Sequence, residues 1–259
     1  MALREALVTA GSLWSELRVL QETGSTNADA AGAARQGAPE GLVVVAEVQT
    51  AGRGRAGRHW NAPLRSGLAV SVLLRPPPAT RASWGWLPLM AGVAVVESVT
   101  QLSGLPLGLK WPNDVLVDDR KLAGLLAEVV EDAVVLGLGL NVTLRPDERP
   151  VPAATSLQIE GSHTIDREPV LRAVLRELAT RYRSFLDHGG DADAAGLHAA
   201  YRSASASLGQ QVRVSLPGGR LVTGEVLDVD TAGRLVVRTG DGIEAFAAGD
   251  VVHLRQAGT

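Results

Sequence analysis

The chain of 259 residues contains no cysteine, and this absence excludes several kinds of site. It rules out a disulfide scaffold, a thiolate metal site and a thiol nucleophile. A chain that manages without disulfides suits the reducing cytosol, and on this basis we expect a cytoplasmic protein.

Long hydrophobic segments are also missing. Residues 1–21 carry charged side chains such as Glu16 among their apolar ones, so they lack the uninterrupted apolar core of a signal peptide. The most apolar long stretch, residues 84–102, is interrupted by Pro88 and Glu97, which favours a buried helix over a membrane span. We therefore expect no membrane partner.

A strong excess of one sign of charge is absent too. The formal net charge is −3, so no overall positive field attracts nucleic acid, and any basic site must be local. Lysine is scarce, because Lys110 and Lys121 are the only two in the sequence. The positions of these two lysines are therefore informative.

What the sequence does contain is one basic, glycine-rich segment, residues 49–60 (QTAGRGRAGRHW), directly after a valine-rich strand predicted over residues 42–48. Glycines let the backbone approach an anion closely, and each guanidinium group can bind two oxygens of a carboxylate or phosphate. We expect the segment to be mobile when empty and to close over an anionic ligand; a solvated basic turn is the alternative. Its notable members are Gly52, Arg53, Gly54, Arg55, Gly57, Arg58 and Trp60, whose ring can cover a flat ligand.

Three further polar patches lie at predicted strand ends or turns, where active-site residues collect. The first is Ser25-Thr26-Asn27, before an alanine-rich helix predicted over residues 28–35. These side chains can cap that helix, or can help its N-terminus hold a polar head group. The others are residues 110–114 (KWPND) and Lys121.

General bases and metal ligands are scarce around these patches. Of the five histidines only His59 is near them, and we interpret it as a loop residue. Neither a Ser-His-Asp set nor a cage of histidines and carboxylates is present in the sequence pattern. A site rich in cations and backbone N–H groups but poor in bases suits phosphate-transfer chemistry, in which positioning and charge neutralisation dominate.

The hydrophobic pattern divides the chain into two parts. Residues 137–139 form a Gly-x-Gly inside a predicted strand; they open no helix, so we expect them to admit a ligand or a neighbouring backbone. From residue 211 to 254 short alternating strands with tight turns predict a five-stranded barrel, which gives domains 1–207 and 208–259. Strands are predicted over residues 17–23, 42–48, 68–74, 107–110, 115–117, 122–130 and 134–142, and helices over residues 28–35, 84–102, 167–188 and 192–203.

Residues 49–60, 110–114 and 120–124 (RKLAG), with Ser-Thr-Asn upstream, together resemble the signature of biotin–protein ligases. The resemblance covers residues 17–160, and the C-terminal barrel is similar to the SH3-like domain of that family. It implies an α+β fold: a mixed β-sheet with helices packed on one face, like that of class II aminoacyl-tRNA synthetases, followed by the small barrel.

The resemblance also implies an activity and its partners. ATP and biotin would form biotinyl-5′-adenylate with Mg²⁺ as cofactor, and a lysine of a biotin carrier domain in an acyl-CoA carboxylase subunit would then receive biotin. Lys121 and Arg53 would be catalytic, and metal ligands stay unknown, with Asp114 as a candidate through water. The implied biotin-binding residues are Ser25, Thr26, Asn27, Gln49, Gly52, Arg53, Gly54, Arg55, Lys121 and Gly124; the implied ATP-binding residues are Arg55, Arg58, Trp60, Lys110, Asn113, Asp114 and Asn141.

The sequence departs from the family pattern at a few positions. Ala56 stands where many relatives have a basic residue, which can alter loop closure, and Asp119 stands where glycine is common. Only some 16 residues precede the first predicted strand, too few for the DNA-binding domain that some relatives carry, so we expect a ligase that is not a repressor.

Two rival functions remain. A lipoate–protein ligase or octanoyltransferase shares the fold, although the Arg/Gly segment favours biotin. A nucleic-acid-binding protein could use the same arginines on phosphates, but the net charge of −3 and a barrel poor in aromatic residues argue against it.

Overall fold

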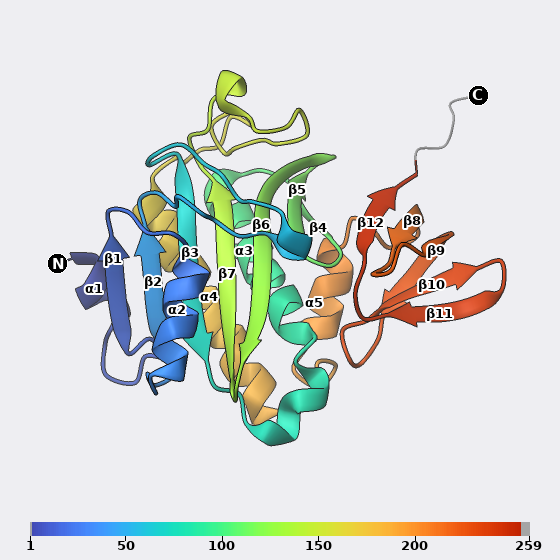
Figure 1. The fold of residues 1–259 in the computed structure, drawn as a ribbon, viewed down its shortest axis with the longest axis horizontal. Coiled ribbons are helices and arrows are strands. Elements are labelled where there is room, and N and C mark those ends of the chain that lie inside the picture. The colour runs from blue at the N-terminus through green and yellow to red at the C-terminus, as the bar shows by residue number, and fades with distance from the viewer. Residues whose placement is uncertain (1, 255–259) are drawn as a thin grey trace.

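The computed structural model describes residues 2–254, and its larger part is built on a seven-stranded mixed sheet (Figure 1). The strand order is β1-β2-β3-β7-β6-β5-β4; β1 and β2 run parallel and the other neighbours antiparallel. The strands are β1 (Glu16–Leu20), β2 (Leu42–Ala46), β3 (Gly67–Leu74), β4 (Leu107–Lys110), β5 (Asp114–Val117), β6 (Arg120–Val130) and β7 (Ala133–Asn141). The expected mixed sheet is confirmed, with strand ends shifted by a few residues.

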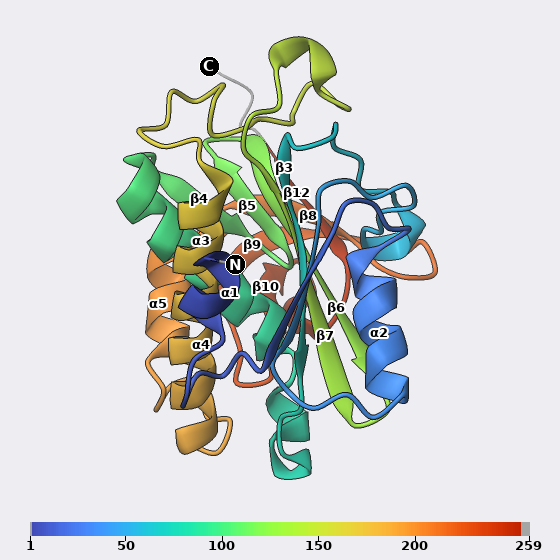
Figure 2. The ribbon, with the colours of Figure 1, turned by 90° about the vertical axis from the view of Figure 1, so that its left-hand side faces the viewer.

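Helices cover both faces of this sheet, as Figure 2 shows edge-on. The long helices α3 (Trp86–Ser103) and α4 (Arg167–Asp187), with the shorter α1 (Ala2–Leu7) and α5 (Leu197–Ala204), lie on one face, as expected. Helix α2 (Thr26–Arg35) lies on the other, which the expectation of a single helical face did not include. Among the described residues no helix combines the length and apolarity needed to cross a bilayer.

The valine-rich strand β2 explains why both faces are covered. Val43 and Val45 belong to the core shared with α3 and α4, whereas Leu42 and Val44 pack with the alanines of α2. A strand buried on both faces carries a continuous apolar run, because alternate side chains point to opposite faces. The same packing places the N-terminus of α2 against Ser71 of β3 and Gly137 of β7, next to the site described below.

The C-terminal part is a second sheet with the order β11-β10-β9-β8-β12. Its strands are β8 (Gln211–Ser215), β9 (Leu221–Val229), β10 (Leu235–Thr239), β11 (Gly242–Phe246) and β12 (Asp250–His253). The five expected strands are confirmed, but within the described residues β11 does not pair with β12, so the hydrogen bonding does not close into a barrel. The edge strands have only five and four residues, and Ile243 on β11 is 67% exposed.

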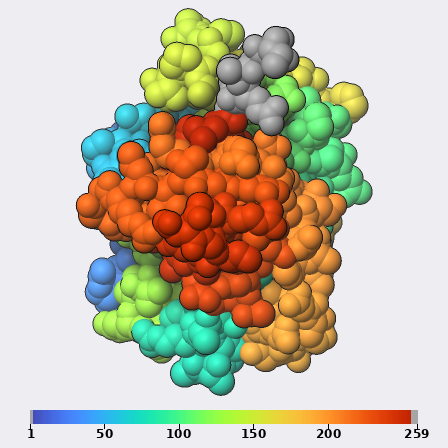
Figure 3. Space-filling model, turned by 90° about the vertical axis from the view of Figure 1, so that its right-hand side faces the viewer, coloured from blue at the N-terminus to red at the C-terminus, as the bar shows by residue number. Residues whose placement is uncertain are grey.

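Buried tryptophans join the two sheets. The indole N–H of Trp86 donates to the carbonyl of Thr231 at 3.0 Å, and that of Trp111 donates to the carbonyl of Gly233 at 3.3 Å. A Cβ atom on Gly85 would lie 2.2 Å from the Ala232 carbonyl oxygen, so glycine permits this close approach. Figure 3 shows the second sheet occupying most of one side of the molecule. The division into domains at residues 207 and 208 stays a prediction.

The predicted helix over residues 192–203 begins later, at Leu197, and its first turn holds a charged cluster against β9. Gly196, with φ of 68°, precedes it, and residues 191–196 form turns that a helix cannot continue. His198 lies between Asp193 (2.5 Å) and Asp228 (3.0 Å), and Arg202 also pairs with Asp228. Burial opposes protonation of His198, but the bonds to the two carboxylates outweigh it, and the pKa of this imidazole is raised.

This cluster predicts a pH-dependent contribution to stability. Since the folded-state pKa of His198 is raised, the contribution is fully present below the unfolded value of about 6.5 and is lost as the pH rises through the folded value. We expect the melting temperature of the wild type, relative to that of His198→Asn, to fall by about 1–3 °C from pH 6 to pH 8.5. Differential scanning calorimetry at both pH values measures this; an equal difference at both would contradict it.

Candidate active site

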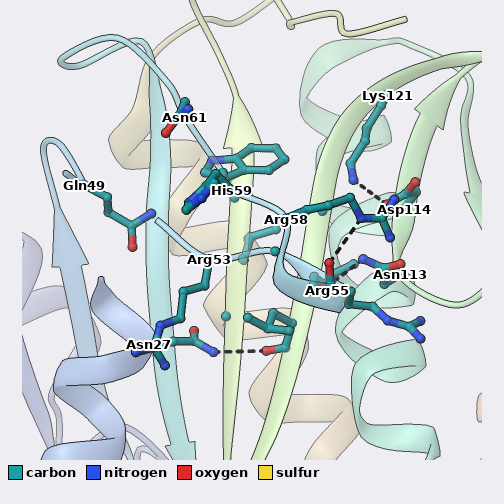
Figure 4. Close-up of a pocket in the computed structure, with 18 of the residues that line it drawn as sticks. Asn27, Gln49, Arg53, Arg55, Arg58, His59, Asn61, Asn113, Asp114 and Lys121 are labelled. Carbon is teal, nitrogen blue, oxygen red and sulfur yellow. Dashed lines mark hydrogen bonds and ion pairs between the residues drawn. The ribbon is translucent and has the colours of Figure 1, made fainter. Parts of the chain in front are cut away.

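A cavity of about 340 Å³ lies over β3, β5, β6 and β7, beside the N-terminus of α2 and under residues 49–60. This size falls in the usual range for small-molecule sites. All the residues predicted for the site line it except Gly52 and Lys110, and Figure 4 shows several of them converging. These lining residues are Ser25, Thr26, Asn27, Gln49, Arg53, Gly54, Arg55, Arg58, Trp60, Asn113, Asp114, Lys121, Gly124 and Asn141.

One end of the cavity is neutral and polar. Ser25 is the N-cap of α2, although its hydroxyl is 3.5 Å from the Ala28 amide, so the cap is weak. The side-chain carbonyl of Gln49 accepts from the Thr26 amide at 2.9 Å and from the Thr26 hydroxyl at 3.1 Å. These hydroxyls can therefore either cap the helix or bind a ligand, which are the two alternatives that the sequence left open.

Two residues behind this polar end were missed by the sequence analysis. Ser71, fully buried in β3, places its hydroxyl 2.8 Å from the Thr26 hydroxyl and 2.6 Å from Asn27 Oδ1. Glu128 in β6 accepts from Asn27 Nδ2 at 2.7 Å. The available signal was Ser71 as the single polar residue of β3, and Glu128 as the single polar residue of β6 after Arg120 and Lys121 at its start.

The loop formed by residues 49–60 folds back on itself. The Gly54 amide donates to the Arg58 carbonyl at 2.7 Å, and the Trp60 amide donates to the Gly52 carbonyl at 2.9 Å. A Cβ atom on Gly52 would lie 2.2 Å from the Trp60 carbonyl oxygen, so Gly52 shapes the loop from outside the cavity lining. Ala56 has φ of 52°, a left-handed conformation that costs a non-glycine residue about 1 kcal/mol. The expected mobility of the empty loop stays a prediction.

The other end of the cavity is charged. Lys121 Nζ lies 2.6 Å from Asp114 Oδ1 and 5.7 Å from the centre of the Trp60 ring. Burial lowers the pKa of the Arg55 guanidinium, whereas the nearby Asp250 carboxylate opposes this effect. A cation that has lost part of its hydration attracts an incoming anion more strongly.

Glycines on two strands make room for these side chains. A Cβ atom on Gly139 would lie 2.2 Å from Trp60 Cε2, and one on Gly137 would lie 2.1 Å from Asn27 Oδ1. On β6, a Cβ atom on Gly124 would lie 3.1 Å from Lys121 Nζ. The Gly-x-Gly of β7 thus admits two neighbouring side chains rather than a neighbouring backbone. Both glycines also line the cavity, so the expected approach of a ligand stays a prediction.

The family model for the biotin/lipoate A/B protein ligase family matches residues 20–142, and that for the biotin protein ligase C-terminal domain matches residues 207–254. The chain is 47% identical over 258 residues to the biotin–[acetyl-CoA-carboxylase] ligase of Mycobacterium tuberculosis, covering 98% of this chain and 95% of that protein. It belongs to the biotin protein ligase family.

Other members of the biotin protein ligase family are similar in sequence or structure. The bifunctional ligase/repressor BirA of Bacillus subtilis is 33% identical over 235 residues, which cover 88% of this chain and 70% of that protein. The biotin protein ligase of Aquifex aeolicus, solved in complex with biotin and ATP, superposes with a TM-score of 0.80 at 29% identity, covering 94% of this chain and all of that one.

Some residues that the family resemblance singled out also hold the protein's own backbone. Asn113 Nδ2 donates to the Leu125 carbonyl at 3.0 Å, and Asn141 Nδ2 donates to the Thr155 carbonyl at 2.9 Å. Lys110 lies on the edge strand β4, outside the cavity lining; burial of His253 and the charge of Lys110 lower the pKa of that histidine. The role of Lys110 toward ATP stays a prediction.

Metal ligands are sparse in this ligase. Within residues 2–254 no group of three or more histidines and carboxylates gathers at one point. Asp114 is the carboxylate in the cavity lining, and it already faces Lys121. This donor set fits a Mg²⁺ ion held mainly by substrate phosphates and water, because Mg²⁺ usually keeps several waters and takes one or two carboxylates.

The second sheet contacts the loop through an ion pair. Arg58 Nη2 lies 2.6 Å from Asp250 Oδ1 on β12, and Arg58 Nε donates to the Arg55 carbonyl at 3.1 Å. Asp250 therefore acts on both arginines, because its charge also opposes the effect of burial on Arg55.

We expect Asp250→Asn to loosen the loop. The ion pair is exposed, so its loss alone is worth less than about 1 kcal/mol, and we expect kcat/KM for ATP to fall about threefold to fivefold. The pyrophosphate-release rate at varied ATP measures this, with Asp241→Asn in the exposed β10–β11 turn as the matched control. A variant equal to the control would show that the contact is not used.

Proposed function

We propose that this chain is an ATP-dependent ligase that joins biotin to AMP and then passes biotin to a protein lysine. In the first step a carboxylate oxygen of biotin attacks the α-phosphorus of ATP, forming biotinyl-5′-adenylate and releasing pyrophosphate. In the second step a lysine amine attacks the acyl carbon, forms an amide and releases AMP.

The observation that carries this proposal is the two-ended cavity. Its neutral end offers hydroxyls and amides, and its other end holds Lys121 and Arg55. The Arg53 guanidinium lies beside Glu128 at the neutral end and would turn toward Lys121, where two anions would have to meet. A carboxylate and a phosphate repel each other, so fixed positive charges that act in a partly dry site lower the barrier to their reaction. Family membership points to the same chemistry.

We assign the neutral end to the ring of biotin. Ser25, Thr26, Asn27 and Gln49 supply donors and acceptors, as a cyclic urea requires. Gly52 and Gly54 shape the loop that closes over the ligand, and closure keeps water away from the reactive mixed anhydride.

We assign the charged end to the reacting groups and the nucleotide. Lys121, beside Gly124, would leave Asp114 and turn to the carboxylate and phosphoryl oxygens, with Arg53 as the second catalytic cation. Trp60 would pack on adenine, and Arg55, Arg58, Lys110, Asn113, Asp114 and Asn141 would serve the phosphates, the ribose or the base. Asp114, once released, would hold Mg²⁺ through water, and the ion would neutralise phosphate charge.

The acceptor is proposed from the family. The relative in M. tuberculosis is a biotin–[acetyl-CoA-carboxylase] ligase, so we propose a biotin carrier domain of an acyl-CoA carboxylase as the partner. No nucleic acid is needed for either step.

The test is pyrophosphate release from the purified chain with ATP, Mg²⁺ and either biotin or lipoate. Release with biotin, and a biotinyl adenylate identified by mass spectrometry, are expected. Release with lipoate alone would assign the chain to the lipoate branch of the wider family, and release with neither acid would refute the proposal.

A further inference from the structure

Glu128 lies behind the neutral end of the cavity and contacts two of the residues that line it. Its Oε2 accepts from Asn27 Nδ2 at 2.7 Å, and its Oε1 lies 3.6 Å from Arg53 Nη1. Figure 4 shows where Asn27 lies in the cavity wall. Glu128 itself does not line the cavity, so any effect on a ligand must pass through its neighbours.

The contacts of Asn27 fix which way its amide points. Nδ2 donates to Glu128 and, at 3.5 Å, to the Leu126 carbonyl, while Oδ1 accepts from the Ser71 hydroxyl at 2.6 Å. An ionised carboxylate is an acceptor only, so turning the amide over would set Oδ1 against Glu128. The carboxylate therefore holds the amide in one orientation.

In this orientation Asn27 Oδ1 lies at the cavity wall. A Cβ atom on Gly137, itself a lining residue, would come within 2.1 Å of that oxygen. A carbonyl oxygen has two lone pairs, and Ser71 uses one of them. Asn27 is 4% exposed but lines the cavity, so the other lone pair is the one that a ligand with an N–H donor would use.

The geometry points to Glu128 as a positioning residue that sets substrate choice: it fixes Asn27 so that the site selects an acid with ring N–H groups over one without them. This inference rests on the proposed function and identifies Asn27 Oδ1 as the acceptor that recognises the ring. The cyclic urea of biotin offers such donors, whereas the dithiolane ring of lipoate has none. A site built to pair with an N–H group discriminates strongly against an analogue that leaves its acceptor unpaired.

The contact of Glu128 with Arg53 is weaker than its contact with Asn27. The distance to Arg53 is 3.6 Å, against 2.7 Å to Asn27, and the Arg53 side chain is 55% exposed. Ion pairs this open to solvent contribute little. If Glu128 acted through Arg53, its loss would affect the reacting carboxylate and the ATP step, not the choice of ring.

The experiment compares Glu128→Gln and Glu128→Leu with the wild type, and uses Glu131→Gln in the exposed β6–β7 turn as the matched control. Glutamine keeps the shape, but its amide can also donate, so Asn27 can adopt either orientation. Steady-state pyrophosphate release gives kcat and the KM for biotin and for ATP. Calorimetry gives the affinity for biotin and lipoate, and thermal melting checks the fold.

For Glu128→Gln we expect the KM for biotin to rise about tenfold while kcat and the KM for ATP change less than about twofold. Glu128→Leu should show a larger rise, and the preference for biotin over lipoate should fall at least about tenfold in both variants. The control should match the wild type.

Two results would overturn the inference while leaving the proposed function standing. One is a wild type that uses biotin and a folded Glu128→Gln variant that binds biotin and rejects lipoate as the wild type does. The other is an equal rise in the KM for biotin and for ATP, which would place Glu128 with the loop. A wild type that releases no pyrophosphate with biotin would instead refute the function itself.

Discussion

Lys121→Ala should lower the rate of adenylate formation about a thousandfold, the upper range for removing one donor from a preorganised anionic site. The side chain lies in the charged end of the cavity, where Nζ is 2.6 Å from Asp114 and 5.7 Å from the Trp60 ring centre. Without Lys121, this flexible cation no longer neutralises the negative charge that develops on the phosphoryl oxygens. Pyrophosphate release with saturating biotin and ATP measures the effect.

The fold should survive this substitution. Asp114 Oδ1 is buried under Lys121, but the Lys121 and Asp114 side chains are 34% and 22% exposed as a whole. Water can therefore enter the space that the truncated lysine leaves and solvate the carboxylate, at a cost of about 1 kcal/mol. Arg18→Ala, on the exposed edge strand β1, removes the same charge far from the cavity and should keep full activity. A rate for Lys121→Ala within tenfold of that control would remove Lys121 from the catalytic role.

The sequence was sufficient where local pattern and burial agree. Strand β2 reads as a buried strand because Leu42 to Ala46 is wholly apolar, and the glycine and arginine spacing of residues 49–60 identified the loop over the cavity. Motifs distant in sequence meet because antiparallel pairing sets Asp114 opposite Gly124, and Gly124 opposite Gly139. The motifs therefore predicted much of the cavity lining.

Contacts across long sequence distances could not be predicted. Asn27 and Glu128 are 101 residues apart, and Arg58 and Asp250 are 192 apart, so nothing local marks either pair. The opposite face taken by α2 depends on which alternate residues of β2 meet which helix. Lys110 illustrates the converse: its motif places it near the site in sequence, but the edge position of β4 turns it toward the second sheet.

Gly139→Ala should impair the ATP side of the reaction more than the biotin side. Its new methyl group would lie 2.2 Å from Trp60 Cε2, and a ring of that size cannot yield by a few tenths of an ångström. Trp60 would have to leave the position in which we propose that it packs on adenine. Loss of one base–aromatic contact together with the displaced ring should lower kcat/KM for ATP about a hundredfold.

Gly137→Ala, two residues earlier on the same strand, is the matched comparison. Its methyl group would lie 2.1 Å from Asn27 Oδ1, so it should weaken biotin binding and spare ATP. Gly32→Ala in α2, where a Cβ atom meets nothing within 4 Å, controls for the added methyl group itself. Calorimetry with biotin and steady-state kinetics with varied ATP separate the two effects. Equal loss of both substrates in both variants would show that β7 is merely distorted, whereas opposite losses would place the two substrates at the two ends of one cavity.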